Sequence, residues 1–98
     1  MSADRQRIDK WLWHARVLRT RTDATRFVNA GHVRRNGRRV GGAGDPVAIG
    51  DVLTLALDRS VRVLEVAGFS DRRGDAAAAR QLYREAVSRD DRASSQPL

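Results

Sequence analysis

Apolar residues near the start of the chain recur every three or four positions, which is the spacing of one face of an α-helix. The stripe consists of Ile8, Trp11, Leu12, Ala15 and Leu18. It predicts a helix over residues 10–18 with Asp9 as its N-cap. Trp13 lies two positions beyond Trp11 and therefore on another side of this helix. We expect Trp11 in the core, whereas the ring of Trp13 needs a different partner.

A second short helix is predicted over residues 23–30, after a polar and basic connection. Thr22 is its expected N-cap, and Asp23 is well placed at the positive end of the helix dipole. The buried stripe of this helix consists of Ala24, Phe27 and Val28. Arg26 points away from that stripe, and Gly31 supplies the left-handed residue that ends the helix.

The pattern then changes to strands and turns. Residues 32–40 predict a strand, a turn at Asn36–Gly37 and a returning strand. Residues 41–50 predict a glycine-rich loop, in which Pro46 argues against a central strand. Alternating apolar residues predict strands at 51–57 and 61–69, and the short link between them makes the two a hairpin.

A last helix is predicted after Asp75, which can cap it. Its apolar stripe consists of Ala79, Leu82, Tyr83 and Ala86, and Glu85 can pair with Arg89 one turn later. From about Asp90 the tail is too polar to contribute to a core. The predicted fold class is α+β, with two short N-terminal helices packed on a small, mostly antiparallel sheet, plus a C-terminal helix.

Positive charge is concentrated in the first forty residues. The chain carries 19 Lys and Arg against 12 Asp and Glu, a net charge of +7, and Lys10 is its single lysine. Between Arg5 and Arg39, ten arginines and that lysine face two acids, Asp9 and Asp23. Such a local surplus favours a polyanionic partner over a merely solvated charge run. Trp13 would then either stack on an exposed base or pack under the C-terminal helix against Leu82 and Tyr83.

Signals for catalysis, metals and membranes are weak. The chain has no cysteine, and His14 and His32 have no partner at metal-ligand spacing, so we expect no metal and no cofactor. The glycine loop lacks the lysine of a phosphate-binding loop, and no serine lies in a nucleophile elbow. No apolar run approaches a membrane span, and the first residues lack a secretory signal. We therefore expect a cytoplasmic, non-enzymatic protein without a membrane partner.

The order of several short motifs resembles the S-four RNA-binding domain. These motifs are Arg7-Ile-Asp-Lys-Trp-Leu-Trp, Thr20-Arg21, Ala30-Gly31-His32-Val33, Asn36-Gly37 and Gly50-Asp51-Val52-Leu53. In that family a helix–loop–helix and the following β-turn, the alpha-L motif, grip structured RNA. Together with Trp-Leu-Trp, the segments Arg72-Arg73-Gly74-Asp75-Ala76 and Leu82-Tyr83 narrow the resemblance to the small ribosome-associated heat-shock protein family. The chain departs from it at residues 40–44, where relatives often carry a Lys-Pro-Ser-like segment.

The resemblance implies an S-four-like RNA-binding domain over residues 7–69, a C-terminal helical extension packed on it over 70–89, and a disordered tail over 90–98. It implies a monomer that binds ribosomal RNA on the large ribosomal subunit. The function would be the rescue or recycling, during stress, of stalled subunits that carry nascent-chain (peptidyl) tRNA. The implied RNA contacts are Arg7, Lys10, Arg19, Arg21, Arg26, His32, Arg34 and Arg35.

Three other interpretations fit the charge. The chain could be a general nucleic-acid module that binds duplex DNA or structured RNA. It could be an accessory domain for RNA modification, although 98 residues leave no room for a catalytic domain. It could also be a structural ribosomal protein. Binding assays on RNA and DNA side by side, and high-salt washes of ribosomes, discriminate among them.

Overall fold

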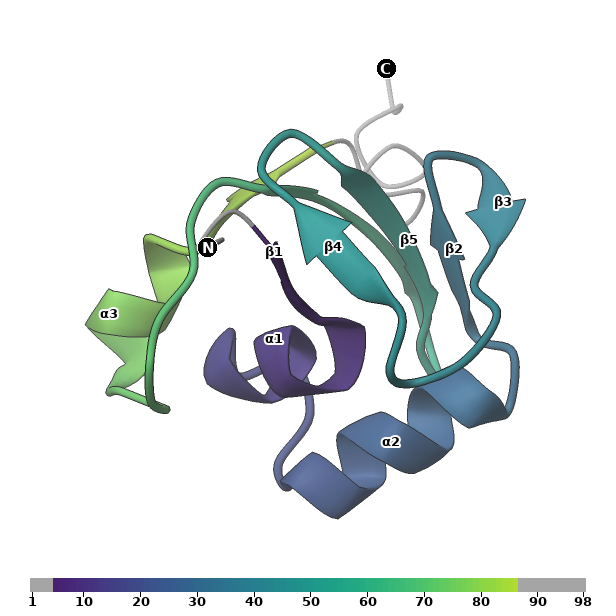
Figure 1. Ribbon diagram of the computed structural model, residues 1–98, viewed down its shortest axis with the longest axis horizontal. Coiled ribbons are helices and arrows are strands. Elements are labelled where there is room, and N and C mark those ends of the chain that lie inside the picture. The colour runs from purple at the N-terminus through teal and green to yellow at the C-terminus, as the bar shows by residue number, and fades with distance from the viewer. Residues whose placement is uncertain (1–4, 87–98) are drawn as a thin grey trace.

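A curved antiparallel sheet and three short helices make up the part of the chain that the computed structural model describes, residues 5–86 (Figure 1). The elements in chain order are β1 (Arg5–Arg7), α1 (Ile8–His14), α2 (Arg21–Asn29), β2 (Val33–Arg35), β3 (Arg38–Arg39), β4 (Pro46–Ala48), β5 (Val52–Ala56), β6 (Val61–Val66), α3 (Ala76–Arg80) and β7 (Tyr83–Glu85). Among these residues, every helix is too short or too polar to cross a bilayer.

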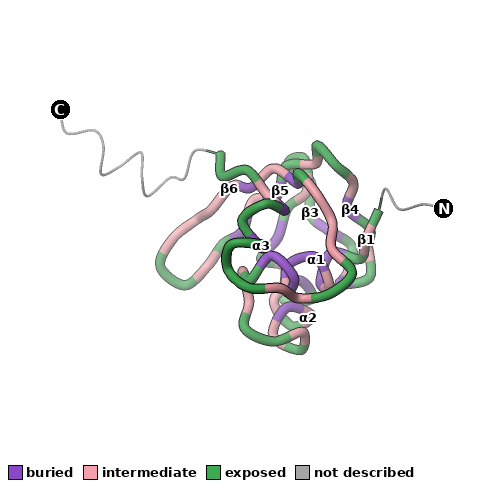
Figure 2. Tube along the Cα trace, turned by 90° about the vertical axis from the view of Figure 1, so that its left-hand side faces the viewer, coloured by how far each residue is buried: buried purple, intermediate pink, exposed green. Residues whose placement is uncertain are grey.

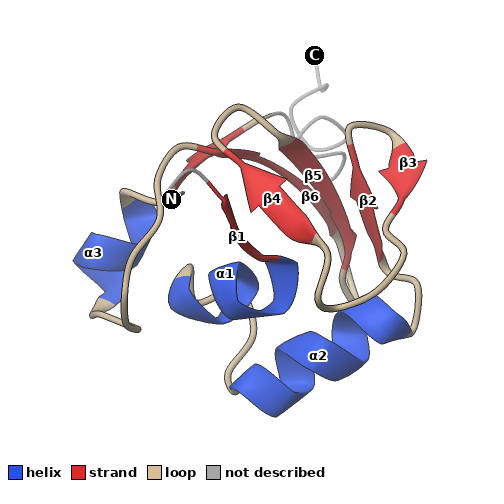
Figure 3. Cartoon of the chain, viewed as in Figure 1, coloured by secondary structure: helices blue, strands red, loops and turns tan. Residues whose placement is uncertain are grey.

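The main sheet has five strands in the order β3-β2-β5-β6-β7, and all neighbouring pairs are antiparallel. A separate two-stranded sheet joins β1 to β4. Figure 3 shows α1 and α2 next to each other below these strands, with α3 on the side away from β2 and β3. The predicted α+β class with a mostly antiparallel sheet is confirmed.

The core lies between α1 and the inner face of the sheets, where Figure 2 shows the buried segments gathered. Trp11 is fully buried, as predicted, and its indole N–H donates to the carbonyl of Gly68 at 2.9 Å. Truncating a buried tryptophan costs about 3–5 kcal/mol. Trp11 therefore both fills the core and ties α1 to the segment after β6.

The first helix is shorter than predicted. It begins at Ile8 with Arg7 in the N-cap position, and Asp9 lies inside its first turn, so the assignment of Asp9 as N-cap is wrong. The helix ends at His14 because Arg16 adopts a left-handed conformation with φ 62°. The amide of Val17 then bonds back to the carbonyl of Leu12, which closes a Schellman motif.

The second helix begins two residues earlier than predicted. Thr20, not Thr22, is the N-cap, and its hydroxyl accepts from the amide of Asp23 at 2.9 Å. Gly31 ends the helix with φ 89°, as predicted. The amide of His32 donates to the carbonyl of Phe27, so this end is also a Schellman motif.

The turn at Asn36–Gly37 is confirmed, since both residues have positive φ, 52° and 84°, as a type I′ hairpin turn requires. The predicted loop over residues 41–50 is partly wrong, because Pro46–Ala48 forms β4 and pairs with β1. An edge strand tolerates a proline, which has no N–H to donate. The hairpin of β5 and β6 is confirmed.

The predicted C-terminal helix is present but much shorter than expected. Asp75 does cap α3, but the helix ends at Arg80, and Tyr83–Glu85 forms β7 along the edge of β6. Strand pairing satisfies the backbone of β6, which a helix there would leave unpaired. Glu85 accordingly pairs with Arg62, at 2.8 Å, on the neighbouring strand. The expected partner Arg89 and the expected disordered tail lie outside the described residues.

Candidate nucleic-acid interface

A buried carboxylate organises the N-terminal basic residues. Asp9 is 1% exposed and accepts hydrogen bonds from Arg7, at 3.0 and 3.1 Å, and from the hydroxyl of Thr25, at 2.9 Å. Arg21 forms an ion pair with the same carboxylate at 3.7 Å. Because Thr25 and Arg21 lie on α2 and Asp9 lies on α1, this network joins the two helices.

The charge state of Asp9 follows from two opposing effects. Burial disfavours the carboxylate and raises its pKa. The hydrogen bonds from Arg7 and Thr25 and the positive charges of Arg7 and Arg21 outweigh burial, so the pKa of Asp9 lies below its usual value. A permanent negative charge therefore holds two guanidinium groups whose side chains remain 53% and 42% exposed. One acid thus orients two cations at the surface.

Three further predicted contacts lie on or next to the helices. Lys10 is half-buried on α1, and Arg19 is exposed in the segment that leads into α2. Arg26 is exposed on α2, on the side away from the buried Ala24 and Val28, as predicted. These side chains extend the positive charge along the two helices beyond the pair that Asp9 holds.

The β2–β3 hairpin carries the remaining predicted residues. Arg34 and His32 are exposed, and the ring of His32 lies 5.2 Å from that of Phe27. Arg35 has a structural partner, because it donates to the carbonyl of Pro46 at 3.1 Å and pairs with Asp51 at 3.4 Å. Arg35 therefore fixes the hairpin to β4 while the charge of its half-buried side chain is partly neutralised.

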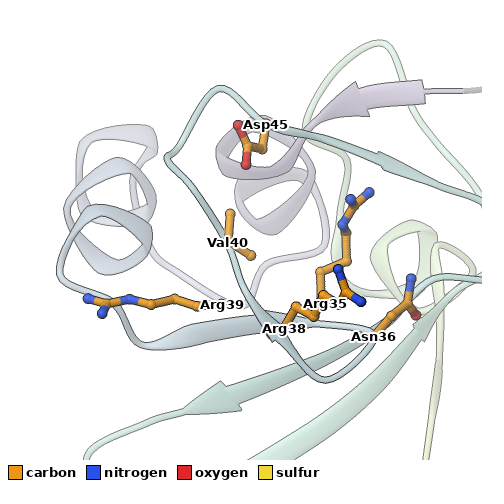
Figure 4. Close-up of a pocket in the computed structure, with 6 residues that line it drawn as sticks. All are labelled: Arg35, Asn36, Arg38, Arg39, Val40 and Asp45. Carbon is orange, nitrogen blue, oxygen red and sulfur yellow. The ribbon is translucent and has the colours of Figure 1, made fainter.

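A pocket of about 320 Å³ opens beside this hairpin (Figure 4). It is lined by Arg35, Asn36, Arg38, Arg39, Val40 and Asp45. In Figure 4 the side chains of Arg35 and Arg38 lie near each other, whereas Arg39 extends toward α2. Three arginines and one acid give the pocket a positive surplus suited to a phosphate group.

Arg38 and Arg39 were not among the eight predicted contacts, although the paired arginines after the turn were a usable signal. The guanidinium of Arg39 packs over Gly31, where an added Cβ would lie 2.7 Å from its Nη2. Gly31 thus serves twice, since it ends α2 and leaves room for Arg39. The charge of Asp45 is engaged by the loop, because its carboxylate accepts from the amide of Gly41 at 2.9 Å.

The structure brings the predicted residues onto neighbouring elements. Arg7 ends β1 directly before α1, Lys10 lies on α1, and Arg21 and Arg26 lie on α2. Arg19 lies in the segment that leads into α2, and His32, Arg34 and Arg35 lie on or next to β2 (Figure 1). Direct side-chain interactions unite Arg7 with Arg21 through Asp9, whereas Arg35 is joined to Asp51 instead. We call Arg38, Arg39 and the eight predicted residues the basic surface; their contacts with RNA remain a prediction.

Trp13 and His14 form a structural cluster that is not part of the basic surface. Trp13 is half-buried against the core, 5.3 Å from the ring of His14, and the guanidinium of Arg73 lies 5.9 Å from its centre. Arg73 also donates to the carbonyl of Trp13 at 3.0 Å. Burial, and then the charge of Lys10, lowers the pKa of His14, which favours the neutral ring. This cluster therefore attaches the segment before α3 to α1.

Within residues 5–86, no group of three or more His, Cys, Asp or Glu side chains is arranged to hold a metal ion. The functional groups offered by the structure are guanidinium, ammonium and imidazole donors around two helices and a hairpin. They can bind phosphate groups and the edges or faces of bases.

Comparisons with known proteins agree with this geometry. The family model of the S4 domain matches residues 6–53. The Heat shock protein 15 homolog of Haemophilus influenzae is 33% identical over 88 residues, which cover 90% of this chain and 66% of that protein. The homolog of Aeromonas salmonicida is 41% identical over 81 residues, 81% of this chain and 59% of that protein. The chain thus spans about 59 to 66% of the length of these curated relatives.

A solved structure extends the likeness to three dimensions. The trimeric structure of Vibrio cholerae Heat Shock Protein 15 superposes with a TM-score of 0.83 at 36% identity. The match covers 95% of this chain and 94% of that one. The overall fold is therefore shared over nearly the whole chain. The protein belongs to the heat shock protein 15 family, and its basic helices and hairpin lie within an S4 domain.

Proposed function

We propose that the protein is a non-catalytic factor that binds ribosomal RNA of the large ribosomal subunit through the basic surface. The observation that carries this proposal is the buried Asp9 network, which presents Arg7 and Arg21 as partly exposed cations at the N-terminal ends of two packed helices. The match to the S4 domain supports RNA as the polyanion. Fixed guanidinium groups lose little freedom on binding, so their contacts with phosphate are favourable.

Binding would be mainly electrostatic. Each phosphate that an arginine neutralises releases a condensed counterion, which makes affinity depend steeply on salt. Phosphate contacts position the protein without reading sequence, so selectivity would come from the shape of a folded RNA. Gly31 sets the backbone between α2 and β2, and Asn36–Gly37 sets the turn between β2 and β3, so the helix and the hairpin would present a defined shape to the RNA.

We propose further that the protein acts in the cytoplasm, on stalled large subunits that retain nascent-chain tRNA under stress. Its family relatives carry the heat-shock name, which supports a role in stress. No cofactor enters this proposal, since binding and release of a subunit need only the cationic side chains. The free protein is expected to be a monomer, and light scattering would distinguish it from a trimer like that of the V. cholerae protein.

Sedimentation of a cell lysate tests the proposal. We expect the protein to travel with free large subunits and to leave them in a high-salt wash. Presence in the soluble top fraction alone would contradict the assignment. Competition between structured RNA and duplex DNA for the purified protein provides the second readout, in which equal affinity would favour a general nucleic-acid module.

A further inference from the structure

An apolar pocket lies at a place that phosphate binding does not explain. It has a volume of about 440 Å³ and is lined by Leu18, Phe27, Leu57, Asp58 and Arg59. The three apolar side chains are half-buried and pack on the core, whereas Asp58 and Arg59 are exposed. The pocket therefore has a hydrophobic floor and a charged rim.

Local backbone geometry creates this floor. Because α1 ends at His14, Leu18 is free of the helix and can line the pocket together with Phe27 of α2. The turn between β5 and β6, closed by the amide of Leu57 donating to the carbonyl of Ser60 at 2.8 Å, brings Leu57 and Asp58 to the same place. The segment before α2, α2 itself and the β5–β6 turn thus line one pocket.

Arg59 lines the pocket itself, and two further cations adjoin its lining residues along the chain. Leu18 is followed by Arg19 and Phe27 is preceded by Arg26, and both arginines are exposed. The ring of His32 lies against Phe27, at 5.2 Å. An apolar floor with an aromatic ring, next to cations, complements a base whose phosphates lie outside the pocket.

We propose that this pocket holds one unpaired nucleobase of the bound RNA, with guanine preferred. This inference rests on the proposed function. Sequence-selective RNA recognition commonly uses bases that leave the stack and lie on aromatic or apolar side chains. Guanine presents two adjacent N–H donors on its pairing edge, which the carboxylate of Asp58 can accept. Uracil presents carbonyl oxygens on both sides of its single N–H donor and would repel that carboxylate. Arg59 would hold a flanking phosphate.

Three RNA hairpins that share the same loop test the proposal. The first has a fully paired stem, the second carries one unpaired guanosine in that stem, and the third carries one unpaired uridine at the same place. We expect the full-length protein to bind the guanosine hairpin about tenfold more tightly than the paired one, the size of one base-stacking contact. In the NMR spectrum of the complex, the signals of Leu18, Phe27 and Leu57 should shift.

Variants at the pocket sharpen the result. Leu57→Asn should remove the preference for the guanosine hairpin while the affinity for the paired hairpin stays within twofold. Asp58→Asn, at an exposed position that tolerates substitution, should make the guanosine and uridine hairpins equivalent. Ile49→Asn is the matched control, because Ile49 is an exposed apolar residue at the β4–β5 turn. It should keep the full preference.

The outcomes separate this inference from the proposed function. Equal binding of all three hairpins, with the pocket signals unmoved, would overturn the base site and leave the basic surface intact. A preference that persists in both Leu57→Asn and Asp58→Asn would also overturn it, since the base would then lie elsewhere. If the protein bound neither the hairpins nor large-subunit RNA, both the proposed function and the base site would be overturned.

Discussion

Two ion-pair clusters at different ends of the chain use arginine in opposite ways. On the helices, the single carboxylate of Asp9 is shared by Arg7 and Arg21, so a positive charge is left over at the surface. On the sheet, Arg62 donates two hydrogen bonds to Glu85, at 2.8 and 3.0 Å, so the charges cancel. The ratio of acids to arginines within a cluster therefore determines whether positive charge is left at the surface, where we propose that it binds RNA.

In the second cluster, an aromatic ring also holds the guanidinium of Arg62 in place. The guanidinium of Arg62 lies 5.7 Å from the centre of the Tyr83 ring, and its hydrogen bonds to Glu85 raise its pKa further above its already high value. Arg62 is thus held by a carboxylate and an aromatic face that join β6 to β7. We expect it to contribute to the attachment of the C-terminal strand and not to RNA affinity.

The largest expected effect comes from removing the shared acid. Asp9→Asn should lower the free energy of unfolding by about 2–3 kcal/mol, because a neutral amide replaces the buried carboxylate and leaves only one of its two oxygens to accept from Arg7 and Thr25. Urea denaturation measures this loss. Asp71→Asn, at an exposed position, is the control and should leave stability unchanged. If the urea midpoint of Asp9→Asn equalled that of the unsubstituted protein, the network would not hold α1 to α2.

The same carboxylate predicts how stability depends on acid. Because the pKa of Asp9 is lowered on folding, its stabilisation is fully present above the unfolded value of roughly 3.9. It is lost as the pH falls through the lower, folded value. The difference in unfolding free energy between the protein and Asp9→Asn should therefore be constant near neutral pH and shrink below about pH 4. A difference that grows with acid would contradict the assigned direction.

A smaller effect is expected when one surface cation is removed. Arg34→Ala should weaken binding to structured RNA by at least about tenfold, since one charged hydrogen bond contributes about 1.5 kcal/mol or more, without changing the melting temperature. Arg80→Ala, at an exposed position on α3, is the matched control and should bind normally. Fluorescence anisotropy with a labelled RNA measures both. Equal losses for the two variants would mean that net charge alone, and not the basic surface, determines affinity.

The smallest effect concerns the neutralised pair. Glu85→Gln should lower the free energy of unfolding by no more than about 0.5–1 kcal/mol, since the pair is partly solvated. RNA affinity should stay unchanged at physiological salt, although the net charge rises by one. If Glu85→Gln tightened RNA binding as strongly as Arg34→Ala weakens it, the two clusters would not differ in role.

Local signals in the sequence predicted the parts of the fold that depend on neighbouring residues. Gly31 and the Asn36–Gly37 turn were identified correctly because positive φ strongly restricts the residue type. The helix predicted after Asp75 failed beyond Arg80 because Tyr83–Glu85 pairs with β6, a contact with residues some twenty positions away. Alternation and helical spacing are difficult to tell apart in so short a segment.

For the candidate site, the sequence predicts which basic residues take part but not which acidic residues they pair with. The sequence identified the arginines, yet Asp9 was interpreted mainly as a helix cap, because its partners Arg21 and Thr25 are distant in the chain. Arg35 is among the expected RNA contacts, although its guanidinium pairs with Asp51, which lies between β4 and β5. Tertiary contacts, which no local pattern encodes, determine which arginines share one acid and which have their charge neutralised by an acid of their own.

The salt dependence of binding to purified large-subunit ribosomal RNA tests the central claim most directly. If the basic surface makes about five phosphate contacts, the logarithm of affinity should fall against the logarithm of salt concentration with a slope of roughly −3 to −5. The double variant Arg21→Ala and Arg34→Ala should reduce the steepness of that slope by about two. A slope near zero, or one that the double variant leaves unchanged, would contradict the account.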